Sequence, residues 1–137
     1  NYPLKRTGNT MTATGKLHCS AWILVFASFS FLQLNDPDPF PWSLVYFLCG
    51  LLWFAELFGR RNIWIIYMAT LGLTFWMGAL ANAPVDLFNL GTTKDLFAEM
   101  SPGKPYIEES REFFGLGICT ISLLILFAKA RSVPVKH

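Results

Sequence analysis

Two short acidic motifs carry the residues of this sequence that are best suited to chemistry. Asn35-Asp36-Pro37-Asp38-Pro39 directly follows an apolar run, and Glu108-Glu109-Ser110-Arg111-Glu112 directly precedes another. Together they offer five carboxylates and one guanidinium group. Hard cations such as Ca²⁺ bind several carboxylate and carbonyl oxygens. One interpretation of the motifs is therefore a site for a metal ion, a lipid headgroup or a cationic ligand.

The simpler interpretation, which we favour, is a structural ion pair. Arg111 adjoins the second acidic motif, and a bidentate pair with Asp36 or Asp38 would fix its planar guanidinium group. The spacing is not that of an EF-hand, and no histidine or cysteine joins the motifs, so no metal ion is predicted. The candidate residues for a structural or ligand-binding role are Asn35, Asp36, Asp38, Glu108, Glu109, Arg111 and Glu112.

Outside the two acidic motifs, the sequence offers little that is typical of catalysis. It has no glycine-rich phosphate-binding loop and no serine or cysteine nucleophile close to a histidine. We therefore predict no catalytic residue, no cofactor and no nucleic-acid partner.

The composition is that of a membrane protein. Of the 137 residues, 53% are hydrophobic and only 15% are charged, and the mean hydropathy is +0.41. Soluble domains have a hydrophobic share of roughly 45–50%. The charges are also clustered, which leaves long uncharged stretches. We therefore predict that the chain lies in a lipid bilayer.

Four stretches have the length of a membrane-spanning helix, about 17–25 mostly apolar residues. Their apolar residues are continuous and do not alternate, which favours helices over the strands of a barrel. The predicted spans are 17–34, 41–58, 62–85 and 113–128. The expected fold is an all-α, antiparallel four-helix membrane bundle over residues 17–128, between basic tails at 1–16 and 129–137.

The connections between the spans carry their own signals. Each proline disfavours helix in the residue before it, so residues 35–41 are expected to be an extended or turn segment. In the third connection, residues 86–112, Thr92 stands three positions before Asp95. This is a capping-box spacing, and it predicts a short helix on the membrane surface.

Within the spans, two predictions concern single residues. Glu56 stands four residues before Arg60, which favours an ion pair on one helix face, with a buried proton-carrying carboxylate as the alternative. Gly72, Gly78 and Gly115 are expected to allow close contact between helices.

The basic residues predict the orientation. If four helices alternate, eight of the eleven lysines and arginines lie on the side of both termini, whereas eight of the nine acids lie on the opposite side. Lysine and arginine accumulate on the cytoplasmic side of membrane proteins. Both termini are therefore predicted to face the cytoplasm or its equivalent, the mitochondrial matrix.

The two acidic motifs also carry a family resemblance. The segment QLNDPDPFPW after the first span and EESREFFGLG at the opening of the last resemble the transmembrane protein 220 family. These are small four-helix membrane proteins with no established activity. The resemblance covers about residues 17–128, and it implies the fold and topology but no reaction.

Two functions are consistent with these observations. The 22 aromatic residues exceed what the inside of four helices needs, which favours a non-catalytic accessory subunit that packs against a larger membrane complex. The alternative is a small enzyme or binding protein that uses the carboxylate cluster. The first 35 residues contain no acid, as at the end of an organellar presequence. This favours the mitochondrial inner membrane, with a bacterial inner membrane as the alternative.

Overall fold

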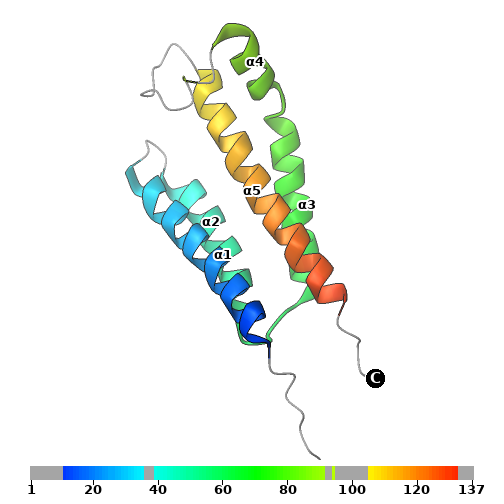
Figure 1. The fold of residues 1–137 in the computed structure, drawn as a ribbon. Coiled ribbons are helices and arrows are strands. Elements are labelled where there is room, and N and C mark those ends of the chain that lie inside the picture. Colours follow the sequence, from blue (N-terminus) through cyan, green and yellow to red (C-terminus); the bar gives the residue numbers. More distant parts are fainter. Residues whose placement is uncertain (1–10, 36–38, 92–93, 95–104, 133–137) are drawn as a thin grey trace, which may run out of the picture. The chain divides into compact units, whose positions relative to one another are not determined.

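The apolar runs of the sequence form α-helices (Figure 1). The computed structural model describes residues 11–35, 39–91, 94 and 105–132. In chain order, the elements are α1 (Ala13–Leu32), a 3₁₀ turn η1 (Gln33–Asn35), α2 (Pro39–Leu57), α3 (Ile63–Ala79), α4 (Asn82–Leu90) and α5 (Pro105–Arg131).

Four helical segments are long and apolar enough to cross a membrane. They are α1, α2, the segment Ile63–Leu90 formed by α3 and α4, and α5. This confirms the four spans predicted from the sequence and their helical character. The surface helix predicted from Thr92 and Asp95 falls on residues outside the described ranges.

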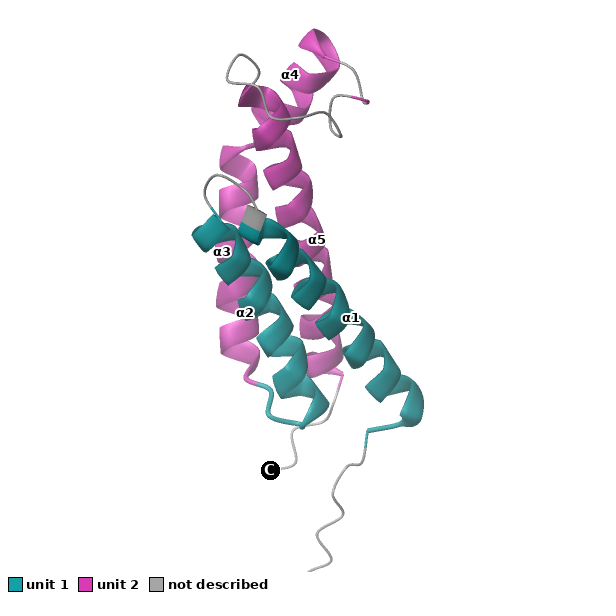
Figure 2. Ribbon diagram, turned by 90° about the vertical axis from the view of Figure 1, so that its left-hand side faces the viewer, with its two compact units in different colours: residues 1–61 teal, residues 62–137 magenta. Residues whose placement is uncertain are grey.

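The chain divides into two compact units, residues 1–61 and 62–137 (Figure 2). In the first unit α1 and α2 lie side by side as a helical hairpin. Near the connection between them, two serines bond across the helices. The Ser30 hydroxyl donates to the Ser43 carbonyl at 3.0 Å, and the Ser43 hydroxyl donates to the Ser30 carbonyl at 2.9 Å. Hydrogen bonds of this kind hold helices together where water is absent.

A glycine allows α1 and α2 to approach closely in the middle of the hairpin. A Cβ atom added at Gly50 would lie 3.3 Å from the Cβ of Phe26. Phe26 is fully buried, and its ring stacks on Trp22 at a centroid distance of 5.6 Å. A side chain at position 50 would therefore press on Phe26 at the point where it joins the backbone of α1.

The second unit consists of α3, α4 and α5. The chain enters α3 through Asn62, whose side-chain oxygen accepts hydrogen bonds from the backbone N–H groups of Trp64 and Ile65. α3 and α5 lie side by side, and α4 packs against α5. α4 buries Ala83 and Leu87, which lie one turn apart.

The sequence predicts one continuous helix over residues 62–85. The structure has two helices in this third span. α3 ends at Ala79 and α4 begins at Asn82. The cause is Pro84, which has no N–H group and whose ring would clash with the carbonyl of the residue four positions earlier, Leu80. In the first turn of α4 this proline is tolerated. The predicted loop beginning at Asp86 is also helical as far as Leu90.

Two further helix boundaries differ from the prediction. α2 begins at Pro39, inside the segment expected to be extended or a turn. Its prolines occupy the first turn, where backbone N–H groups have no partner within the helix. α5 begins at Pro105, well before the predicted start at Phe113. The second acidic motif is therefore part of α5.

Candidate functional site

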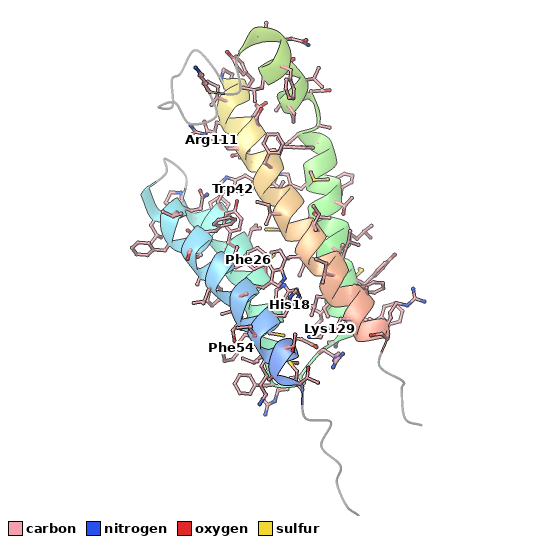
Figure 3. The ribbon with its side chains drawn as sticks, in the orientation of Figure 1. His18, Phe26, Trp42, Phe54, Arg111 and Lys129 are labelled. Atoms are coloured by element: carbon pink, nitrogen blue, oxygen red, sulfur yellow. The ribbon has the colours of Figure 1, made fainter. Side chains whose placement is uncertain are left out.

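The predicted site residues on α5 occupy its first turns. Glu108, Arg111 and Glu112 are half-buried, and Glu109 is exposed. Figure 3 shows Arg111 near the N-terminal end of α5 and Lys129 near the C-terminal end. Carboxylates are favoured at this end because it carries the positive pole of the helix dipole. Glu108, which lies in the first turn, therefore has a structural reason for its position.

The other half of the predicted site is outside the described residues. The backbone of Asn35 ends the turn η1, but the side chain of Asn35 and all of Asp36 and Asp38 lie outside the described ranges. The ion pair of Arg111 with either aspartate therefore stays a prediction. Among the described residues, no group of three or more His, Cys, Asp or Glu side chains is arranged to hold a metal ion.

Near the C-terminal end of α2, at the other end of the hairpin from the turn at Asn35, a carboxylate is fully buried. Glu56 has an exposed fraction of 0%, and its Oε2 lies 3.1 Å from Nε of Arg61, whose side chain is 24% exposed. Ion pairing is thus confirmed for Glu56, but with Arg61 and not with the predicted Arg60. A buried carboxylate of this kind needs a counter-charge, because desolvation of an isolated ion costs several kcal/mol.

The end of α2 explains why Arg61 is the partner. Gly59 has a φ angle of +66°, in the left-handed region that glycine adopts without strain. Its N–H donates to the Glu56 carbonyl at 2.9 Å, and the Arg60 N–H donates to the Ala55 carbonyl at 2.8 Å. This is a Schellman motif, which ends the helix. Arg60 therefore leaves the helix face that an i,i+4 pair requires, and the following residue returns to Glu56.

Aromatic rings form a cluster near the same end of the hairpin. Trp53 is fully buried, its ring stacks on Trp22 at 5.7 Å, and the His18 ring meets it edge-on at 5.3 Å. The indole Nε1–H of Trp22 donates to Nε2 of His18 at 3.3 Å. His18 and Phe54 both appear toward this end in Figure 3. These contacts join α1 to α2, which indicates a structural role for the cluster.

The three cysteines of the chain are also buried, and none forms a disulfide. Cys19 lies on α1, Cys49 on α2 and Cys119 on α5. They contribute to helix packing.

Within the described part of the chain, two open, largely apolar grooves are further candidates for binding. The α1–α2 groove has a volume of about 260 Å³ and is lined by Ile23, Ala27, Phe47, Gly50, Leu51 and Phe54. The α3–α5 groove has a volume of about 210 Å³ and is lined by Ile63, Trp64, Tyr67, Phe127 and Arg131. Each lies within one unit.

The sequence pattern predicted neither groove, and it did not predict Arg61 as the partner of Glu56. The grooves depend on which faces of neighbouring helices meet, and single-helix patterns do not show this. For Arg61 a signal was present, since a glycine just after a helix end predicts a chain reversal.

Comparison with known proteins identifies the family. Residues 25–128 match the family described as "Transmembrane family 220, helix". Neither the curated proteins nor the solved structures gave a match. The matched segment covers most of the 137 residues, and it includes both acidic motifs and the apolar runs beside them. The chain therefore belongs to transmembrane family 220.

Proposed function

We propose that this protein is a non-catalytic accessory subunit that packs against a larger membrane-protein complex. The α1–α2 groove carries the proposal. We assign it to one transmembrane helix of a partner protein. A surface that faces only lipid needs no shaped recess, whereas helices associate in membranes by close packing around small residues.

The residues of the groove support a helix as its occupant. Ala27 and the half-buried Gly50 contribute little side-chain bulk, whereas Phe47, Leu51 and Phe54 are 58%, 47% and 47% exposed. Small residues flanked by large apolar side chains form the kind of hole that receives a side chain from a facing helix. The exposed phenylalanines then gain packing contacts that fluid lipid supplies less completely.

The orientation and compartment are further parts of the proposal. We place both termini on the matrix side of the mitochondrial inner membrane. Support comes from the eight basic residues assigned to that side. The groove itself does not depend on this choice.

The test fills the groove without disturbing the contact of α1 with α2. Ala27 is exposed, so Ala27→Trp places a ring in the recess. Leu24→Trp is the matched control, because Leu24 is 68% exposed on the same helix and does not line the groove. The complex is solubilised in mild detergent, its native mass is measured, and its members are identified by mass spectrometry.

The expected result is a complex of fixed stoichiometry with an integral membrane protein, formed by the unaltered chain and by the Leu24→Trp variant. Ala27→Trp should release the 15.5 kDa chain from it. If the unaltered chain migrates alone, or if both substitutions leave the complex intact, the proposed role of the groove is wrong.

A further inference from the structure

The α3–α5 groove combines aromatic walls with a positive charge at one end of the second unit. Trp64 is 73% exposed and Tyr67 is 44% exposed. The Tyr67 ring lies 6.0 Å from the Phe127 ring and 6.5 Å from the Trp64 ring. The guanidinium carbon of the exposed Arg131 lies 5.8 Å from the centroid of Phe127. The groove therefore offers an apolar surface next to a cation.

Among the described residues, the charged side chains in the two helix ends that form the groove are basic. The last turn of α5 contains Lys129 and Arg131, and the first turn of α3 contains no acidic residue. The C-terminal pole of a helix carries about half a negative charge, which these two cations exceed. One carbonyl group at the end of α5 is already hydrogen-bonded, since the Ser132 hydroxyl donates to the Lys129 carbonyl at 2.8 Å.

The first N–H groups of α3 do not provide the anion-binding group. The side chain of Asn62 already accepts hydrogen bonds from Trp64 N–H at 3.0 Å and from Ile65 N–H at 3.3 Å. An anion at the groove would therefore be held by the Arg131 guanidinium group, whose planar donors suit the two oxygens of a phosphate.

We propose that the α3–α5 groove binds one anionic phospholipid. The upper part of an acyl chain lies along Ile63, Tyr67 and Phe127, and the phosphate is bound by Arg131. Exposed Trp64 lies at the rim, where tryptophan prefers the level of the lipid headgroups. Basic pockets between membrane helices bind anionic headgroups for the same reasons of charge and shape.

The test compares two lipids on the full-length chain. Phosphatidylglycerol and phosphatidylcholine with identical acyl chains are titrated onto the protein in a non-ionic detergent, and bound lipid is counted by native mass spectrometry. We expect one tightly held phosphatidylglycerol per chain. Arg131→Gln should weaken its binding by about tenfold, the effect of losing a hydrogen bond between charged groups, and should weaken phosphatidylcholine binding less, because the choline group neutralises the charge of its phosphate.

Two further variants separate the site from general charge attraction. Arg60→Gln removes the same charge at an exposed position that does not line the groove, and it should change binding by less than about twofold, since solvent and salt screen an exposed charge that does not contact the lipid. Trp64→Ala should weaken both lipids, because it removes apolar wall and no charge. Circular dichroism and thermal denaturation establish that each variant is folded.

Three outcomes would overturn the proposal. Equal retention of the two lipids would exclude selection for negative charge. Equal losses for Arg131→Gln and Arg60→Gln would indicate general attraction to basic residues. Unchanged binding by Trp64→Ala would show that lipid does not occupy the groove.

Discussion

At the scale of single residues, Glu56 and Arg61 differ in their access to water, and this predicts unequal effects of substitution. Arg61→Met leaves a fully buried carboxylate without this counter-charge, which costs roughly 3–5 kcal/mol. Glu56→Gln leaves a guanidinium group that is 24% exposed and can extend to water. Thermal denaturation of the purified chain in detergent should therefore show a larger loss for Arg61→Met.

The double variant tests whether these two effects have one origin. Substitutions that remove the same contact are not additive. Glu56→Gln combined with Arg61→Met should therefore be more stable than the sum of the single losses implies. Additive losses, or a larger loss for Glu56→Gln, would contradict the importance of the pair.

The same pair illustrates what can be predicted for individual residues. A charged partner for Glu56 was predictable, because a carboxylate in an apolar span needs one. Its identity was not predicted, because the i,i+4 rule assumes that the helix continues, whereas Gly59 ends it. The candidate site was predictable only in part. The acidic end of α5 is helical, and the pairing of Arg111 with Asp36 or Asp38 stays a prediction.

At the scale of the helices, the sequence predicted which segments are helical, but not the residues at which these helices begin and end. Long apolar runs leave few alternatives to a helix in a membrane, because every backbone polar group must be bonded internally. Boundaries depend instead on single residues such as Pro84, which separates α4 from α3, and Pro39, which starts α2.

The contacts between helices were also not predictable from the positions of glycines. Gly72 and Gly78 were predicted to allow close helix contact, but a Cβ atom added at either would meet no atom within 4 Å among those described. Gly50, which was not singled out, is the one that lies against Phe26. The identity of the residue does not reveal which face of its helix meets a neighbour.

This difference predicts opposite effects of substitution at two helical glycines. Gly50→Val should destabilise the hairpin of α1 and α2 by about 1–3 kcal/mol, because the added atoms must displace buried Phe26. Gly72→Ala is the matched control and should stabilise α3 by about 0.5–1 kcal/mol, because alanine loses less backbone entropy. Denaturation midpoints measured in one detergent provide the comparison. A stabilising Gly50→Val would show that α1 and α2 are not in close contact at Gly50.

At the scale of the whole molecule, four candidate spans and the charge distribution predict a topology. An even number of crossings would return the chain to its starting side, and the distribution of basic residues predicts that this side faces the cytoplasm or matrix. The chain is suited to cysteine labelling because Cys19, Cys49 and Cys119 are buried and should react little with a membrane-impermeant maleimide.

Three single substitutions are sufficient for the measurement. Thr14→Cys and Ser132→Cys lie at exposed, uncharged positions near the two ends of the described chain, and Lys94→Cys lies at an exposed position between the third and fourth spans. None of them removes a basic residue from the side of the termini, so the charge bias that sets the orientation is retained. In sealed membranes of known sidedness, we expect Thr14→Cys and Ser132→Cys to be labelled from the cytoplasmic or matrix side and Lys94→Cys from the other. Labelling of Lys94→Cys from the same side as Thr14→Cys would mean an even number of crossings between those positions, which three spanning segments cannot give.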